Sequence, residues 1–354
     1  MQIDNGNTNP LNSQNLSQLF SIYTKEHIRL DLQRKMKRFH TEFYDVLIES
    51  RCSMPMYIRT IWLFTYSDMK TIVFPQSIFG VMTAYAASVL DQPTASHGAL
   101  SWVLVRYPLA LFWTWSNLLP FDIFNQLSED AIEEDRINKP WRPLPSGIVD
   151  RERATTLMLR HYIFAIIVSS SIGGLHQSLF LVLLGTWYNA GGGADRSFVI
   201  RNLINAAGIL SFASGAMEVA LGTPLLVTET SAQWIGILAS VIFTTIQTQD
   251  LYDTEGDACR GRKTMPLVIG DSPTRWWTAV IVLMFSILCP LFWSLGQLAC
   301  VLPLVFGVII AVRTLTRRTP EADRRTFQFY NVWMVSIYSL PLIRYLVLGS
   351  EKGV

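Results

Sequence analysis

The sequence predicts an all-α, polytopic membrane protein with nine transmembrane helices around a central cavity and two Asp-rich loops facing the cytosol. Half of the 354 residues are hydrophobic and only 16% are charged, against about 25% charged residues in a soluble domain. The apolar residues gather in blocks of about 20 residues, the length that crosses a hydrocarbon core of roughly 30 Å. We expect these blocks to be helices, because only helices and closed barrels satisfy their backbone in lipid.

The chain divides into a polar, basic N-terminal region, residues 1–59, and a membrane domain, residues 60–354. Residues 1–20 are polar and Asn-rich, which is typical of a disordered tail and unlike a cleavable signal peptide. Residues 21–59 carry the basic run Arg34-Lys35-Met36-Lys37-Arg38. A solvated helix face and a basic helix lying on the membrane surface both remain open for this run.

Nine apolar segments account for the membrane domain. They cover residues 71–90, 101–121, 155–173, 177–190, 202–221, 232–249, 275–295, 298–315 and 328–348. The four cysteines are scattered without the spacing of a disulfide framework or a metal site. The net charge of +2 gives no electrostatic reason to expect nucleic-acid binding.

The loops between these segments alternate in basic charge. Those near residues 91–98, 172–175, 222–231 and 294–297 contain no Lys or Arg, whereas the other loops and the N-terminal region are basic. The positive-inside rule therefore places the N-terminus and the basic loops in the cytosol and the C-terminus on the far side. The alternation also predicts an odd number of spans.

The basic loop after the sixth segment is also acidic. Asp250, Asp253 and Asp257 are spaced i, i+3, i+7, so they share one face if the helix continues through them. Packed carboxylates repel one another unless a cation lies between them. Oxygen ligands with room for water and phosphate suit Mg²⁺.

The loop after the second segment, residues 125–147, has the same mixture of acids and bases at an equivalent position. A lone acid at a helix end is usually a solvated cap, but two such loops favour a diphosphate site. Guanidinium and ammonium groups in both loops would hold the phosphate oxygens. Neither the calcium-loop pattern nor a P-loop is present in the sequence.

Polar residues also end the fourth segment and begin the fifth on the same membrane face. They are Tyr188, Asn189, Arg201, Asn202 and Asn205. Lining of a cavity and hydrogen bonding between helices both remain open for them.

The second acidic loop resembles the signature of the UbiA superfamily of intramembrane prenyltransferases. That family's second motif, DxxDxxxD, is matched by the three aspartates of this loop, and the run Gly261-Arg262-Lys263-Thr264 with Pro266 also matches. The resemblance covers roughly residues 60–350. It implies nine helices, with one Mg²⁺-binding acidic motif after the second helix and another after the sixth.

The first motif departs from the family pattern NDxxDxxxD. The spacing from Asn125 to Asn138 is about two residues longer than usual. Counting forward from Asn125 selects Gln126, Glu129 and Glu133, whereas counting back from Asn138 makes Asp135 the last acid. We favour Asn125 and Asp135 as anchors, with Asp130 and Glu134 between them, and Gln126 in place of an acid implies an altered metal shell.

This variant resembles a fungal branch of the superfamily that includes terpene cyclases. The similarity rests on the Asn-Lys-Pro-Trp-Arg-Pro stretch, residues 138–143, and on Ser67-Asp68-Met69-Lys70-Thr71. It implies an endoplasmic-reticulum enzyme of terpenoid biosynthesis. Farnesyl diphosphate is the favoured substrate and geranylgeranyl diphosphate the next. The resemblance to this branch favours a cyclase over a prenyltransferase that moves the isoprenyl group to an aromatic acceptor, and no acceptor-activating histidine lies in either motif. A non-enzymatic membrane transporter or scaffold is a distant alternative.

The resemblance implies roles for particular residues. The predicted catalytic set is Asn125, Asp130, Glu134, Asp135, Asp250, Asp253 and Asp257, of which Asn125, Asp135, Asp250, Asp253 and Asp257 would bind Mg²⁺. The predicted diphosphate ligands are Lys139, Arg142, Arg262 and Lys263. Loss of diphosphate from an allylic carbon creates a carbocation, which aromatic faces stabilise by roughly 0.5–2 kcal/mol each.

Overall fold

The structure, a computed structural model, describes residues 54–93 and 100–351, and the helical unit that contains the site begins at Thr60. Within the described residues all regular structure is helical, which confirms the all-α prediction. The longer elements are α2 (Met54–Thr65), α3 (Phe74–Tyr85), α4 (Leu100–Asn125), α5 (Glu129–Asn138), α6 (Arg151–Ile172), α7 (Leu175–Asn189), α9 (Phe198–Leu221), α10 (Glu229–Thr245), α13 (Asp271–Phe292), α14 (Gln297–Thr316), α15 (Pro320–Tyr338) and α16 (Leu340–Glu351). The short elements are η1 (Met69–Val73), η2 (Ala87–Leu90), α8 (Gly193–Arg196), η3 (Ile246–Thr248), α11 (Thr254–Arg260) and α12 (Met265–Ile269).

Five helical stretches among the described residues are long and apolar enough to cross a membrane. They are Arg151–Ile172, Phe198–Leu221, Asp271–Phe292, Gln297–Thr316 and Pro320–Ser350. The other four expected segments overlap α3, α4, α7 and α10. The count of nine spans stays a prediction.

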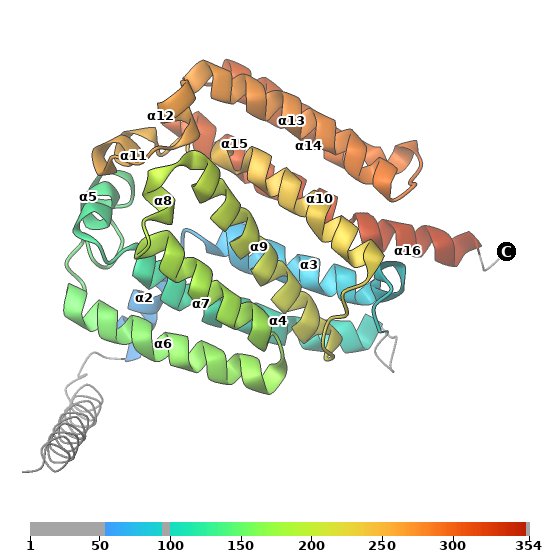
Figure 1. Ribbon diagram of the computed structural model, residues 1–354, viewed down its shortest axis with the longest axis horizontal. Coiled ribbons are helices and arrows are strands. Elements are labelled where there is room, and N and C mark those ends of the chain that lie inside the picture. The colour runs from blue at the N-terminus through green and yellow to red at the C-terminus, as the bar shows by residue number, and fades with distance from the viewer. Residues whose placement is uncertain (1–53, 94–99, 352–354) are drawn as a thin grey trace, which may run out of the picture. The chain divides into compact units, whose positions relative to one another are not determined.

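Helix α9 is the central element of the unit and contacts α3, α4, α7 and α10 (Figure 1). At its crossing with α3, Gly80 lies against the α9 backbone. A Cβ on Gly80 would stand 2.5 Å from the carbonyl carbon of Ala216. Small residues at such crossings let two helices approach closely enough for backbone packing, as is common between transmembrane helices.

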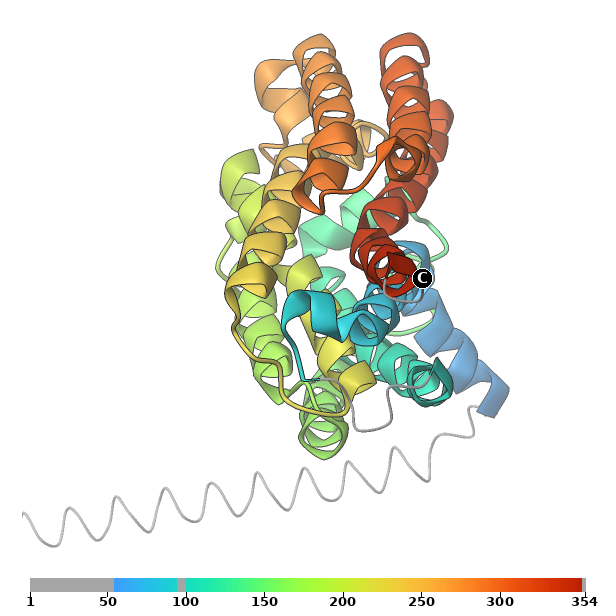
Figure 2. The same ribbon diagram turned by 90° about the vertical axis from the view of Figure 1, so that its right-hand side faces the viewer.

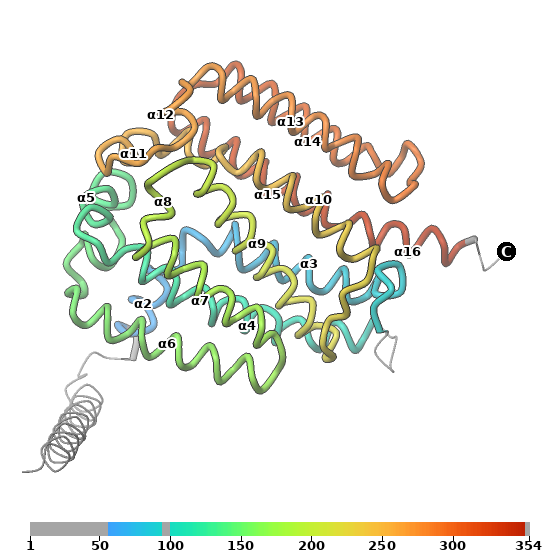
Figure 3. The backbone as a smooth tube through the Cα atoms, viewed as in Figure 1, coloured from blue at the N-terminus to red at the C-terminus, as the bar shows by residue number. Residues whose placement is uncertain are grey.

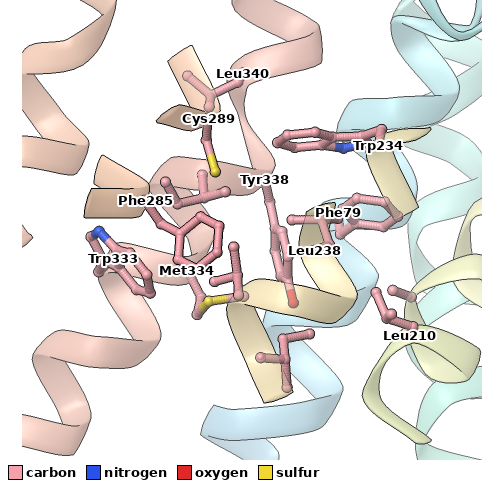
Figure 4. Close-up of a cluster of buried hydrophobic side chains, with 14 of the residues drawn as sticks. Phe79, Leu210, Trp234, Leu238, Phe285, Cys289, Trp333, Met334, Tyr338 and Leu340 are labelled. Carbon is pink, nitrogen blue, oxygen red and sulfur yellow. The ribbon is translucent and has the colours of Figure 1, made fainter. Parts of the chain in front are cut away.

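The C-terminal helices α13, α14 and α15 pack together at one side of the unit (Figures 1 and 2). A buried aromatic cluster joins α15 to its neighbours (Figure 4). Tyr338 packs edge-on against Phe79 of α3 with ring centroids 5.0 Å apart, and the indole of Trp333 donates to Ser286 Oγ at 2.9 Å. These aromatic residues give α15 a fixed position against α3 and α13.

The two acidic segments form short helices, α5 and α11, that lie side by side at one end of the unit (Figure 3). The sixth apolar segment does not continue as one helix through the acids. Helix α10 ends at Thr245, the backbone tightens into η3, and α11 begins only at Thr254. The condition for one shared face, a sixth helix that continues through the acids, is therefore not met. At this break the hydroxyls of Thr245 and Thr248 and the amide of Gln247 bond nearby carbonyls.

Candidate active site

A cavity of about 380 Å³ lies between α4, α7 and α9 and is bounded at one end by α5 and α11. Along α7 and α9, the polar residues that line the cavity lie near one helix end and the apolar ones lie farther along the helix. On α9 the lining runs from Arg201 and Asn205 to Ile209 and Phe212, and on α7 it runs from Tyr188 back to Leu181. The cavity therefore has a charged end beside the acidic segments and an apolar end between the helices.

The aspartates of the second motif each have one carboxylate oxygen without a partner. Asp250 accepts from Arg201 Nη2 at 2.9 Å, and Asp257 accepts from Arg262 Nη1 at 3.0 Å. Asp250 Oδ2, Asp253 Oδ1 and Asp257 Oδ2 are buried without a hydrogen-bond partner. Each of these carboxylates thus keeps one oxygen for another ligand.

Burial raises the pKa of the Asp250 carboxyl to about 6, against the opposing charge of Arg201. Burial also raises the pKa of Asp253, although the ammonium of Lys139, 3.9 Å away, acts in the opposite direction. A low-dielectric environment disfavours the charged form of a carboxyl group. An added cation would favour the ionised form of both residues.

Glu134 connects the two motifs. Its Oε1 accepts from Arg262 Nη1 at 2.8 Å, and its Oε2 accepts from Arg260 Nη1 at 3.2 Å. Burial alone would raise the pKa of Glu134, but the charges of Arg262, Lys139 and Arg260 lower it below its usual range. A carboxylate of α5 is therefore held ionised by arginines from the other motif.

Asp135 pairs with Arg142 inside the first motif. Arg142 Nη1 donates to both carboxylate oxygens of Asp135 at 2.9 Å, and both side chains are buried. Although burial opposes its charge, Asp135 and Asp68 raise the pKa of Arg142. The pair fixes the Asn-Lys-Pro-Trp-Arg-Pro stretch against α5.

The structure brings most of the predicted site residues together, but not all of them. Asn125, Glu134, Asp135, Lys139, Arg142, Asp253 and Arg262 line the cavity, and Asp250 and Asp257 contact lining arginines. Asp130 is exposed at the start of α5, and Lys263 is exposed after α11, and neither lines the cavity. Asp130 is displaced because the helical turn of α5 directs Ala131, Glu134 and Asp135 inward instead.

The polar residues of the fourth and fifth segments have different roles. Tyr188 lines the cavity and bonds Arg201. Asn189 instead donates to Gly185 of its own helix, and Asn202 donates to the Phe243 carbonyl on α10 at 3.1 Å. Asn189 and Asn202 are not among the cavity-lining residues, and Asn202 serves interhelical bonding.

Several charged residues at the site were not predicted from the sequence. Asp68 and Asp122 line the cavity beside Arg142, and Asp195 of α8 accepts from Arg262 Nε at 3.2 Å. The segment that contains Asp68 had a recognisable pattern, Ser67 to Thr71. Asp122 had none, because it directly follows an apolar segment and precedes the motif.

The donor set fits Mg²⁺ as an ion shared with the substrate rather than one held in a preformed protein cage. Among residues 54–93 and 100–351, no three His, Cys, Asp or Glu side chains converge as a ready metal site. However, four buried aspartate oxygens, on Asp122, Asp250, Asp253 and Asp257, and the amide oxygen of Asn125 lack partners. Mg²⁺ is commonly held by one or two carboxylates together with substrate phosphates and water, and these oxygens suit that arrangement.

Comparisons with known proteins agree with this architecture. Residues 73–334 match the model of the UbiA prenyltransferase family. The chain is 27% identical to the fumagillin beta-trans-bergamotene synthase af520 of Aspergillus fumigatus over 81% of this chain and 92% of that protein. It is 29% identical to the diterpene cyclase eriG of Hericium erinaceus over 75% of this chain and 82% of that protein.

A solved structure shares the fold. A UbiA homologue from Archaeoglobus fulgidus bound to GPP and Mg²⁺ superposes with a TM-score of 0.52 at 14% identity, covering 77% of this chain and 98% of that one. The family match spans most of the chain, including both acidic segments and the cavity-lining helices α4, α7 and α9. The chain belongs to the UbiA prenyltransferase family.

Proposed function

We propose that this protein is a membrane-bound terpene cyclase that ionises a linear isoprenyl diphosphate with Mg²⁺ and cyclises the resulting carbocation. The observation that carries the proposal is the two-ended cavity, in which unpartnered carboxylate oxygens and buried arginines face an apolar compartment. Similarity to proteins named as a bergamotene synthase and a diterpene cyclase supports cyclisation.

The charged end has the groups that diphosphate departure requires. Asn125, Asp250, Asp253 and Asp257 would hold Mg²⁺, with Asp135 supporting the first motif through Arg142. An ion held by these residues would supply positive charge to the leaving oxygens. Lys139, Arg260 and Arg262 present fixed positive charge to the same end of the cavity, where preorganised donors stabilise a transition state without reorganisation.

The apolar end suits the isoprenyl chain. Leu118, Phe121, Leu181, Ile204 and Phe212 line it, so the hydrocarbon lies away from water. With the chain folded in this compartment, its own double bonds attack the cation, and loss of a proton completes the reaction. A volume of about 380 Å³ is within the range of ligand cavities, roughly 300–1,000 Å³, and farnesyl diphosphate is the favoured substrate, with geranylgeranyl diphosphate next.

Transfer of the isoprenyl group to an aromatic acceptor is the second candidate, because the matching family is one of prenyltransferases. In that reaction the acceptor, rather than the chain's own double bonds, attacks the cation. A transporter or scaffold would not explain why acids and arginines gather at one end of a cavity whose other end is apolar.

We also propose that nine helices span the membrane, with the N-terminus and both acidic segments in the cytosol, and that the enzyme is in the endoplasmic reticulum. The alternation of basic charge in the loops supports this orientation. The structure contributes one consistent feature, since α5 and α11 lie at the same end of the unit.

Microsomes containing the protein, supplied with farnesyl diphosphate and Mg²⁺ but no acceptor, test the proposal. We expect release of diphosphate and a volatile hydrocarbon detectable by gas chromatography. Asp253→Ala should abolish both, whereas Glu255→Ala, an exposed change two residues away, should not. Turnover only after addition of an aromatic acceptor would overturn the cyclase assignment, and undiminished turnover in EDTA would overturn the metal requirement.

A further inference from the structure

Asp122 is a buried carboxylate that the motif pattern does not include. It lies on α4, one turn before Gln126, and lines the charged end of the cavity. Only 2% of the residue is exposed, and its Oδ2 is buried without a hydrogen-bond partner. A carboxylate withdrawn from water in this way needs a counter-ion or a proton, and its free oxygen is available to a ligand in the cavity.

Gln126, at the position where the family pattern has an acid, serves another purpose. Its Nε2 donates to the Phe64 carbonyl at 3.2 Å and to the Asp122 carbonyl at 2.9 Å. The side chain therefore fastens the end of α4 to α2. Asp68 follows the end of α2 within a few residues. The hydrogen bond from Gln126 to Phe64 therefore also helps to position the turn that contains Asp68.

Asp68, Asp122 and Arg142 all line the cavity. The two carboxylates act electrostatically on each other and on Arg142. Arg142 Nη1 pairs with Asp135 at 2.9 Å, whereas Arg142 Nη2 lies 3.7 Å from Asp68 Oδ2. Asp135 and Asp68 thus both pair with one buried guanidinium, Asp122 forms no ion pair with it, and the nearby Lys139 lies 3.9 Å from Asp253.

We propose that Asp68 and Asp122 form the first-motif half of a divalent-cation site, binding one ion together with the substrate's diphosphate oxygens. Asp122, one helical turn earlier, supplies the carboxylate that is absent at position 126. Asp68 supplies a second oxygen ligand from the turn after α2. Two carboxylates with phosphate oxygens form a typical Mg²⁺ shell. This inference rests on the proposed function, since the ion is shared with the diphosphate.

Binding of Mn²⁺, used as a paramagnetic probe, tests the site without turnover. The purified protein in nanodiscs is titrated with Mn²⁺ in the presence of the unreactive analogue farnesyl thiolodiphosphate, and free Mn²⁺ is followed by EPR. We expect Asp122→Asn and Asp68→Asn each to weaken binding of one ion by at least about tenfold. The double variant should be little worse than either single one, because both side chains bind the same ion.

Glu255→Gln is the matched control, since it removes an exposed carboxylate outside the cavity. Thermal melting without metal checks folding, and Asp122→Asn should melt no lower than the wild type because it removes charge repulsion. Unchanged Mn²⁺ affinity in both Asp68→Asn and Asp122→Asn, with loss in Asp253→Asn, would overturn this inference alone. Absence of Mn²⁺ binding by the wild-type protein with the analogue would overturn the proposed metal mechanism as well.

Discussion

Gly256 of α11 lies directly against the side-chain amide of Asn138 at the end of α5. A Cβ at position 256 would overlap Asn138 Nδ2 and Cγ. The two acidic segments therefore approach each other as closely as they do because one of them has no side chain at the point of contact. This approach brings Glu134 within hydrogen-bonding distance of Arg260 and Arg262.

Gly256→Ala should separate the two segments. Overpacking a tight contact costs about 1–3 kcal/mol, and displacement of α11 would also lengthen the Glu134–Arg262 contact. We expect a lower melting temperature and a reduced kcat with farnesyl diphosphate. The second substitution Asn138→Ala should restore part of both, whereas Glu255→Ala should leave both unchanged; a fully active Gly256→Ala protein would contradict this role of the glycine.

Arg262 pairs with three carboxylates of the site, and the adjacent Lys263 offers a control substitution of a basic residue. Arg262 contacts Glu134, Asp257 and Asp195, whereas Lys263 is exposed. Because an ammonium cannot reproduce the planar guanidinium fork, Arg262→Lys should lower kcat/KM by at least about tenfold, corresponding to roughly 1.4 kcal/mol. Lys263→Ala should change it less than about twofold by the same measure, and a larger loss in Lys263→Ala would restore the role predicted for it from sequence.

The sequence was sufficient to predict an all-helical fold, and the two acidic segments that it singles out lie side by side in the structure. Hydrophobic blocks and the grouping of acids in two loops are local features of the sequence, so they can be recognised without the fold. The register of the first motif was not predictable, because it depends on which face of α5 meets α11. That choice buries Glu134 and Asp135 and leaves Asp130 exposed.

Asp122 and Asp68 were not predictable for a different reason. Neither has a motif spacing to the other acids, and they come together only because α4 and the turn after α2 border the same cavity. Asn202 was ambiguous because its polarity suits a cavity wall and an interhelical bond equally. Only the position of the Phe243 carbonyl on α10 decides between them.

The buried pair Arg275–Asp323 should carry much of the stability of the C-terminal helices. Arg275 Nη1 and Nη2 donate to the two Asp323 oxygens at 2.8 and 2.6 Å, and each side chain is 2% exposed. Removing one partner of such a pair typically costs about 3–5 kcal/mol, because the other charge is left buried. Arg275→Met should therefore lower the melting temperature in detergent markedly.

The matched control for this pair is Arg318→Met, because Arg318 is half exposed and lies 3.7 Å from Asp271. That change should have almost no effect, as is typical of surface ion pairs, about 0–1 kcal/mol. The double variant Arg275→Met/Asp323→Leu should recover much of the loss, since no buried charge remains. A double variant as unstable as Arg275→Met alone would show that packing, rather than the uncompensated charge, causes the loss.

Phe212 should limit the length of the isoprenyl chain. It is buried on α9 at the apolar end of the cavity, about three helical turns from Arg201 at the charged end. Phe212→Ala enlarges the compartment where the chain terminus lies, so geranylgeranyl diphosphate should gain relative to farnesyl diphosphate. A pocket change of this size typically alters relative kcat/KM by about tenfold or more.

Competition between the two diphosphates, with products resolved by gas chromatography, measures the effect of Phe212→Ala directly. The matched control is Phe180→Ala on α7, because Phe180 is 47% exposed and does not line the cavity. We expect Phe180→Ala to keep the wild-type preference, since it leaves the compartment unchanged. If Phe212→Ala keeps that preference too, while the variant remains folded and active, chain length is set elsewhere than at the apolar end of α9.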